Sequence, residues 1–454
     1  MSVAAAAVPA APSRATPVAE VVFRGLVLLF AGTALAAYTL GPIPAPWVAQ
    51  GGLVALAAAL VLGRDRVMVV PGGTVLVAFV AWALAVNVLQ ADRYMSIMPM
   101  NASLPYPLYV AVRYVGIFSF AAAFYLALWL MYRGYAPRLV NAVVLVGVSV
   151  ALFSFYVYAA HIFGLPEPPR NRAGTGDAGG PQATLFSSGS TGVYRRMLGP
   201  FREPSQLAEW LLIPFFFSFA RTGRLARTCR ACLGGALVLT VSMGGLVSAC
   251  AGAVMGLLLT HPLRAGNRRR VVVMLATVGA VAFVAGGISV GAGENVTNLL
   301  SIVTFRIDEI LEGGIGQSNR GYVLDYIREN PAPPLGYGMG NGNIIFSEHA
   351  GLHRPVSFLS LYVNVLYSAG VVGLALLAIF LARPVLRAMR TRGDTELGAT
   401  PVFLMAYLAH MVMFAVNSEE LTIPFALAAA VLVYQVGRVW PRPAASPPPP
   451  AGAA

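Results

Sequence analysis

Arginines gather where a polar stretch of the chain runs into an apolar one. In the segment YRRMLGPFREPSQLAEWL, Arg195, Arg196 and Arg202 precede a hydrophobic run, and Glu203 lies beside them. The planar guanidinium offers several donors and stays charged at any relevant pH, so arginine is suited to bind phosphate oxygens. Arginines at such a position can also simply contact lipid headgroups. The segment therefore indicates either a phosphate site or contacts with a membrane surface.

A second polar segment, residues 318–343, lies between two long hydrophobic segments and reads SNRGYVLDYIRENPAPPLGYGMGNGN. Ser318 can cap a short helix that carries Arg320, and Pro331 can end that helix. A glycine hairpin is predicted beyond the proline, with a backbone that can approach a ligand closely. Its glycines are Gly336, Gly338, Gly340 and Gly342. We expect this segment to form the lid or floor of an active site outside the membrane.

Candidates for a general base lie close to these arginines in the sequence. His353 can accept a proton near neutral pH, although an exposed histidine without a task is the simpler interpretation. Glu348 and Glu203 offer carboxylates, and Arg354 adds another arginine next to His353. His349 and His353 are separated by a glycine-containing stretch without a helical frame, which disfavours a metal site.

Two further features limit the chemistry. The chain has no DxD-type carboxylate pair for Mg²⁺ and no P-loop, which disfavours reactions with a soluble nucleotide sugar or ATP, and no cofactor or metal is expected. His410 and Arg113 fall within apolar runs, where ionisable side chains are costly and therefore functional suspects. Arg113 can also extend its head group out of the membrane from near a helix end.

The composition indicates a polytopic membrane protein. Hydrophobic residues make up 57% of the 454 positions and charged residues 11%, too little polar surface to cover a soluble globule. The net charge of +13 comes from arginines alone and falls mostly in short loops, the pattern of the positive-inside rule. The basic balance is therefore not evidence for nucleic-acid binding.

The hydrophobic runs predict an all-α fold of about twelve transmembrane helices. The continuous run 231–260 is expected to divide into two passes near Ser242, Gly244 and Gly245, which keeps the arginine-rich loops on one side. The expected runs are 21–40, 47–63, 67–90, 108–132, 139–164, 207–220, 231–242, 244–260, 271–291, 357–382, 400–417 and 420–438.

Charge asymmetry then predicts the orientation and the domain organisation. Both termini face the cytoplasm, as disordered tails at residues 1–20 and 441–454, and residues 21–440 form one transmembrane domain. Two long loops, residues 165–206 and 292–356, lie on the outer side with most of the acidic residues and contain short helices. Function is expected on that outer face.

Three segments together resemble the O-antigen polymerase and O-antigen ligase superfamily of bacterial polysaccharide assembly, the Wzy/WaaL type. The first is RMLGPFREPSQLAEWL, with Ser205 where the family has asparagine, and the second is VSMGGL at 241–246, with Met243 in place of an arginine. The third matches an Arg, Pro, Gly-x-Gly run at Arg320, Pro334, Gly336, Gly338 and Gly340. The His-Asn type of pair that family ligases carry is replaced by residues around 357–360, which favours an exopolysaccharide polymerase.

The resemblance implies a metal-independent membrane glycosyltransferase of the GT-C type in the bacterial inner membrane. It would polymerise oligosaccharide units carried on undecaprenyl diphosphate at the periplasmic face. A base among His353, Glu203 and Glu348 would deprotonate the acceptor hydroxyl. The arginines that would hold the diphosphate leaving group are Arg195, Arg196, Arg202, Arg320 and Arg354.

The partners that the resemblance implies are the lipid-linked glycan donor, a glycan or lipid acceptor, membrane lipid and other polysaccharide-assembly membrane proteins. A ligase that moves a finished glycan from undecaprenyl diphosphate to a lipid or protein acceptor is the first alternative. A transporter or flippase is the second, and it is disfavoured because charges crowd into the outer loops and not at the bilayer midplane.

Overall fold

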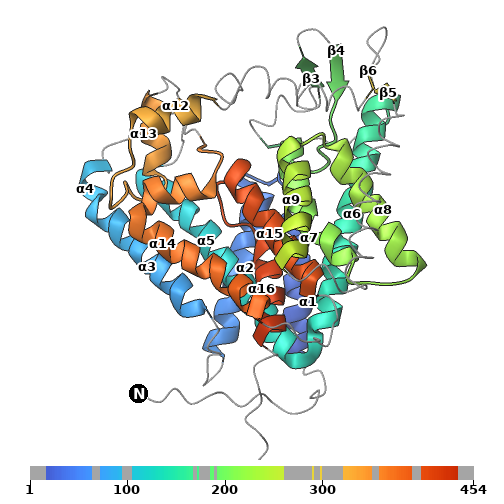
Figure 1. Cartoon of the computed structure of the whole chain (residues 1–454), viewed down its shortest axis with the longest axis horizontal. Helices are drawn as coiled ribbons and strands as arrows, with labels where there is room; N and C mark the ends of the chain where they lie inside the picture. The colour runs from blue at the N-terminus through green and yellow to red at the C-terminus, as the bar shows by residue number, and fades with distance from the viewer. Residues whose placement is uncertain are drawn as a thin grey trace, which may run out of the picture.

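The computed structural model describes residues 17–63, 72–94, 105–166, 171–172, 185–188, 192–259, 289–290, 297–298, 321–349, 357–390 and 400–437. These residues form mostly helices, and the long ones pack side by side as a bundle (Figure 1). By length and composition, Ala45–Leu62, Tyr106–Ala160 and Leu361–Arg390 are long and apolar enough to cross a membrane. Shorter apolar helices lie among them, which is the arrangement of a helical membrane protein.

The helices alternate in direction along the chain and leave small elements at the ends of the bundle. The long helices are α1 (Pro17–Gly32), α2 (Ala45–Leu62), α3 (Gly73–Leu89), α5 (Tyr106–Leu130), α6 (Ala136–Phe163), α7 (Pro204–Ser218), α8 (Arg224–Leu239), α9 (Met243–Leu259), α14 (Leu361–Arg390), α15 (Thr400–Val416) and α16 (Ile423–Gly437). The short ones are α4 (Ala91–Tyr94), α12 (Gly321–Glu329) and α13 (Asn341–His349), and a π-helical turn, η1 (Met131–Tyr135), joins α5 to α6.

The loops contain short antiparallel strand pairs, which the predicted all-α fold did not include. They are β1 (Thr39–Leu40) with β2 (Ile43–Pro44), β3 (Leu185–Ser188) with β4 (Gly192–Arg195), and β5 (Ser289–Val290) with β6 (Thr297–Asn298). Register places Leu40 opposite Ile43 and Leu185 opposite Arg195. The polar loops pair locally because their backbone groups need partners outside the helices.

Eleven of the twelve predicted hydrophobic runs contain a described helix, and the run 271–291 lies outside the described residues except for β5. The number of membrane passes therefore stays a prediction. The division of the run 231–260 is present, because α8 ends at Leu239 and α9 begins at Met243. Between them Val241 has a φ of 48°, and the Ser242 hydroxyl accepts a bond from the Gly245 amide at 3.3 Å. A left-handed residue followed by a serine cap ends one helix and starts the next.

Helix α15 lies at the centre of the bundle, in contact with α7, α9, α14 and α16. Its closest neighbour is α9, where a Cβ on Gly252 would lie 2.5 Å from the backbone of Ala409 and one on Gly256 would lie 2.4 Å from Met405. Small residues allow such a close approach, which strengthens van der Waals packing where no hydrophobic effect drives helices together.

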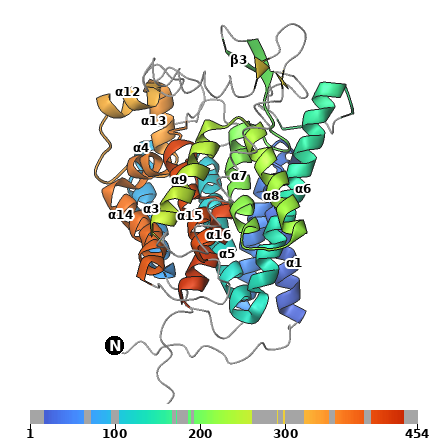
Figure 2. The same ribbon diagram turned by 45° about the vertical axis from the view of Figure 1, so that its right-hand side comes forward.

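The segments that carry most of the predicted chemistry lie at one end of the bundle. Figures 1 and 2 both place α12, α13 and the β3–β4 pair at the end opposite the start of α1. At the α1 end, Arg138 of α6 pairs with Glu20 at 3.6 Å. The predicted separation of arginine-rich turns from the long polar loops stays a prediction.

The segment 321–349 is a helix, a loop and a second helix, and the predicted glycine hairpin is wrong. Gly342 lies inside α13, which starts one residue after Gly340. The loop pairs with the interrupted part of α14: the Tyr337 amide donates to the Tyr367 carbonyl at 2.7 Å and the Gly338 amide to Ser368 at 2.8 Å. Within the loop only tight turns form, from the Gly336 amide to the Pro333 carbonyl at 3.0 Å and from the Asn341 amide to the Gly338 carbonyl at 3.1 Å, so the loop makes no hairpin.

The glycines of this loop allow close approach to the protein itself. Gly336 has a φ of 83°, and a Cβ there would lie 2.5 Å from the Ser368 carbonyl oxygen. Gly370, where α14 departs from helical geometry, has a φ of 67° and faces the Pro334 carbonyl at a Cβ distance of 2.1 Å. The glycine loop and helix α14 can therefore pack this closely only because Gly336 and Gly370 lack side chains.

We expect Gly336→Ala to lower the thermal midpoint of the detergent-solubilised protein clearly, with a destabilisation of about 2 kcal/mol from the left-handed φ and the backbone clash together. Gly51→Ala is the matched control, because nothing lies within 4 Å of a Cβ at Gly51 within helix α2. Alanine at that site should leave the midpoint unchanged or raise it slightly. Equal midpoints for the two variants would contradict the packing role of Gly336.

Candidate functional site

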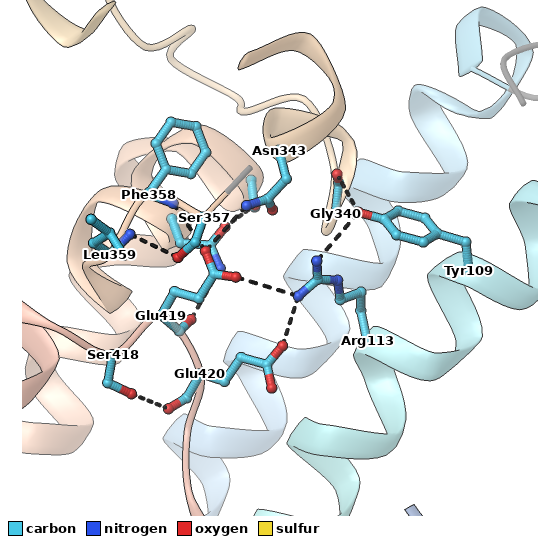
Figure 3. A network of polar contacts seen from close by, with 12 residues as sticks. Tyr109, Arg113, Gly340, Asn343, Ser357, Phe358, Leu359, Ser418, Glu419 and Glu420 are labelled. Atoms are coloured by element: carbon cyan, nitrogen blue, oxygen red, sulfur yellow. Dashed lines mark hydrogen bonds and ion pairs between the residues drawn. The ribbon is translucent and has the colours of Figure 1, made fainter. Parts of the chain in front are cut away.

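The most heavily charged junction in the described part of the bundle is centred on Arg113 of α5. Its Nη1 lies 2.7 Å from Glu420 Oε1 and 3.6 Å from Glu419 Oε1, and both glutamates lie on the turn between α15 and α16. Figure 3 shows the guanidinium between Tyr109 and the two carboxylates. The Arg113 side chain is 20% exposed, Glu419 is 16% exposed and Glu420 is 55% exposed. The cluster therefore extends from the bundle interior to an accessible carboxylate.

Glu419 forms the inner wall of this cluster. Its Oε2 accepts bonds from the Asn343 side chain at 3.1 Å and from the Phe358 amide at 3.0 Å, while its backbone carbonyl accepts from Asn364 at 3.0 Å. Burial raises the pKa of the Glu419 carboxyl above its ordinary value, and Arg113 partly offsets this effect. These bonds tie the α15–α16 turn to α13 and α14, so Glu419 is chiefly a structural anchor for its neighbour Glu420.

Tyrosines and amides hold the glycine loop against α5 and α3. Tyr109 donates to the Gly340 carbonyl at 3.1 Å, and Tyr106 donates to Asn341 at 2.8 Å. Asn87 of α3 accepts from the Met339 amide at 2.8 Å through its side-chain oxygen. The loop that was expected to cover a ligand is thus fastened to the helices on which the charged cluster is built.

A second arginine, Arg172, lies within electrostatic range of both Glu420 and Arg202. Arg172 donates to the Ala36 carbonyl at 2.9 Å, and burial lowers its pKa to about 10. The positive charge of Arg202 contributes to this lowering of the Arg172 pKa and the negative charge of Glu420 opposes it, so Arg172 interacts electrostatically with both groups. Arg113 thus pairs directly with both carboxylates, while Arg172 interacts with Glu420 and Arg202 only through longer-range electrostatics. Such a cluster retains a net positive charge suited to an anionic ligand.

The predicted arginines are distributed unequally around this cluster. Arg202 belongs to it through Arg172. Arg196 instead donates to the carbonyls of Thr240 at 3.0 Å and Val241 at 3.3 Å, at the interruption between α8 and α9. For Arg195 the structure describes only the backbone, in β4. The diphosphate role of these residues stays a prediction.

The predicted bases lie at exposed positions or outside the described residues. Glu203 precedes Pro204 at the start of α7 and accepts a bond from the Ser205 hydroxyl at 3.2 Å. Glu348 is exposed near the end of α13. His353, like Arg320 and Arg354, lies outside the residues that the structure describes.

A metal site finds no support in the described ranges. His349, one of the two histidines considered for a metal, lies 3.7 Å from Glu329 and packs its ring against Tyr326. Within those ranges no group of three or more histidine, cysteine, aspartate or glutamate side chains is placed to hold a metal ion. The expectation of metal-independent chemistry stays a prediction.

A second polar group lies inside the bundle. His410 of α15 is fully buried, and its Nε2 lies 2.8 Å from the Thr422 hydroxyl and 3.4 Å from Glu209 Oε1 on α7. Its ring stacks on Phe425, with centroids 5.4 Å apart. His410, a functional candidate because it is an ionisable residue within an apolar run, thus lies next to a carboxylate, that of Glu209.

Sequence reasoning undervalued Arg113 and did not select Arg172 or Glu420. Arg113 was visible as an arginine in an apolar run near a helix end, and the structure adds its partners Glu419 and Glu420. Glu420 is separated from Arg113 by 307 positions, and no local pattern relates them. An acidic pair in a short turn between two apolar runs was the available signal.

Comparison with known protein families finds no family model that matches, and comparison with curated proteins finds no match. The fold and the cluster define a helical protein of membrane type, with an arginine and glutamate site at one end of its bundle. The resemblance to polysaccharide polymerases therefore depends on the motifs alone.

Proposed function

We propose that the protein is a membrane glycosyltransferase that polymerises oligosaccharide units linked to undecaprenyl diphosphate. One observation carries the proposal: Arg113 pairs with a half-exposed carboxylate, Glu420, at the end of an apolar bundle, and Arg172 lies within electrostatic reach of Glu420 and of Arg202. A lipid diphosphate combines an apolar tail with a charged head, and this site offers helices for the tail and guanidinium groups for the head. A GT-C-like organisation belongs to the same proposal.

The reaction assigns a separate task to each kind of group. The acceptor hydroxyl oxygen attacks the anomeric carbon of the donor while the bond from that carbon to the diphosphate oxygen breaks, and the bonding electrons leave with the diphosphate. Arg113, Arg172 and Arg202 stabilise the charge that develops on the leaving group. The proton of the acceptor hydroxyl passes to a carboxylate, for which Glu420 has the combination of exposure and fixed position.

The residues expected from the motifs complete the proposed site. Arg320 and Arg354 would add donors for the diphosphate, and His353, Glu203 or Glu348 remain alternative bases. Gly336, Gly338 and Gly340 act in this proposal through the loop they shape, which α3 and α5 hold next to Arg113. No cofactor is required for the transfer.

The proposed location is the bacterial inner membrane, with the site on the periplasmic face and both termini in the cytoplasm. The sequence supports this orientation through the positive-inside rule, because most arginines fall in short connections while the acidic residues gather in the long polar loops. The expected partners are the lipid-linked donor, the growing glycan, membrane lipid and other assembly proteins of the same membrane.

Purified protein in detergent or liposomes should convert an undecaprenyl-diphosphate-linked oligosaccharide into a ladder of products that differ by one repeat unit. Gel electrophoresis with a labelled donor resolves the ladder. A ligase would give a single transfer product, and only when a lipid or protein acceptor is added. The absence of both ladder and transfer product with matched donors would refute glycosyl transfer.

A transporter or flippase is a second candidate, favoured by interrupted helices and by a buried ionisable pair. Helix α14 departs from helical geometry at Gly370, the α8–α9 junction interrupts another apolar run, and His410 contacts Glu209 in the interior. The double variant Arg196→Ala, Arg320→Ala separates the two classes. Retained flux of a lipid-linked glycan across liposomes by that variant would favour transport over transfer.

A further inference from the structure

The buried pair His410–Glu209 lies directly beneath the turn that carries the accessible carboxylate. The turn runs from Asn417 to Thr422, between α15 and α16. Its first half is held from outside the bundle, where Asn343 and Phe358 bind Glu419. Its last residue is held from inside the bundle, where His410 Nε2 lies 2.8 Å from the Thr422 hydroxyl. Glu420 lies between these two attachments.

The environment of the ring indicates which nitrogen carries the proton. Among the residues that the structure describes, His410 Nδ1 is buried without a hydrogen-bond partner. A buried N–H donor without a partner is costly, so the favoured neutral tautomer carries its proton on Nε2, between the Thr422 oxygen and Glu209 Oε1. That N–H donates to Thr422, and the Glu209 carboxylate at 3.4 Å favours the proton on Nε2 through its negative charge, without a hydrogen bond of its own.

Burial and packing make this contact rigid. The ring is stacked on Phe425 and meets Phe414 edge-on at 5.0 Å, so it has no free rotation toward another partner. Glu209 is 12% exposed and lies on α7, which begins only five residues earlier at Pro204. The pair therefore connects α7, which starts beside Arg202, to the turn that presents Glu420.

We propose that His410, oriented by Glu209, is a positioning residue that holds Glu420 in the reactive cluster through Thr422. The proposal rests on the proposed glycosyl transfer for its functional meaning, while the hold on the turn is a property of the protein alone. Loss of the Nε2 donor should free the inner end of the turn and let Glu420 move away from Arg113. The reaction would then lose its aligned base without losing a group that contacts substrate.

The position of the turn can be measured without substrate. Ser418 is buried within the turn, at 7% exposure, so a Ser418→Cys probe should react slowly with a membrane-impermeant maleimide. Cys229, Cys232 and Cys250 are replaced by alanine in this background. We expect His410→Phe to raise the labelling rate about tenfold, as loss of one buried hydrogen bond allows. Thr422→Val, which removes only the hydroxyl, should act in the same direction and serves if His410→Phe does not fold.

Tyr407→Phe is the matched control. Tyr407 is buried on the same helix, one turn from His410, and donates to the Leu381 carbonyl at 3.0 Å, away from the turn. Its loss should leave Ser418→Cys labelling unchanged. His410→Gln, which restores an N–H donor, should return labelling toward the original rate. Unchanged labelling in both His410→Phe and Thr422→Val would overturn the proposal, whatever the protein catalyses.

Polymer formation supplies the second measurement, in the chain with Ser418 intact. His410→Phe should lower kcat about tenfold and leave KM for the lipid-linked donor within about twofold, because alignment and not donor binding is lost. His410→Gln should recover most of the rate. Faster labelling with an unchanged kcat would overturn the positioning role. Faster labelling in a protein that makes no polymer at all would leave the hold on the turn supported and refute the proposed function instead.

Discussion

Arg113→Ala is expected to reduce polymer formation at least about 100-fold, the scale on which loss of one donor to a developing oxyanion acts in enzymes. The variant removes the cation that lies 2.7 Å from Glu420 and 3.6 Å from Glu419. It deletes a donor for the diphosphate and also releases the carboxylate proposed as base. The measurement is the initial rate of ladder formation per mole of monodisperse protein.

Arg113→Ala should also lower the stability of the fold, and this effect must be separated from its effect on the reaction rate. Glu419 would remain largely buried without its cation, and breaking a buried pair from one side costs about 3–5 kcal/mol. Arg113→Lys keeps the charge but loses the two-pronged geometry, so it should fold like the original chain and recover only part of the rate. A loss of rate in a lysine variant with an unchanged thermal midpoint isolates the chemical contribution.

Arg138→Ala is the control for removing an arginine from an ion pair. Arg138 pairs with Glu20 at 3.6 Å at the other end of the bundle, with a side chain that is 65% exposed. Exposed pairs of this kind contribute about 0–1 kcal/mol, so rate and thermal midpoint should both be retained. A folded Arg113→Ala protein that polymerises at the original rate would remove Arg113 from the proposed site.

The contrast between Arg113 and Arg196 shows what local patterns could predict. Hydrophobic length and arginine placement predicted the helices and the interruption of the run 231–260, because each depends on residues near in sequence. The partner of each arginine depends on chain direction over hundreds of positions. Arg196 binds carbonyls at the end of α8, while Arg113 meets the α15–α16 turn, and neither outcome is encoded in its flanking residues.

For the glycine loop, too, the sequence predicted the local backbone conformation but not its distant contacts. Several glycines in a row indicate unusual φ values or a close approach, and Gly336, Gly338 and Gly340 indeed have positive φ. The sequence did not show what approaches them. In the fold it is α14 at Gly336 and the side chains of Asn87 and Tyr109 at the other two glycines. The glycine pattern thus predicted the positive φ values and a close approach, but not the protein segments that approach these glycines.

Glu420→Gln should lower kcat by about 10²–10⁴-fold, the usual contribution of a positioned general base. Glutamine keeps the shape of the side chain and an oxygen that can accept from Arg113, but it cannot take a proton. Because the Glu420 side chain is 55% exposed, the thermal midpoint should change little. KM for the lipid-linked donor should stay close to the original value, since the arginines that would hold the diphosphate are untouched.

Glu203→Gln and Glu348→Gln test the alternative bases under the same conditions. Both side chains are exposed, and no described ion pair joins either of them to Arg113. If Glu420 accepts the proton, these two variants retain rates within a few-fold of the original, whereas Glu420→Gln does not. The reverse order of effects, with a slow Glu203 or Glu348 variant and an active Glu420→Gln, would transfer the role of base to the outer loops and leave Glu420 only as the counter-ion of Arg113.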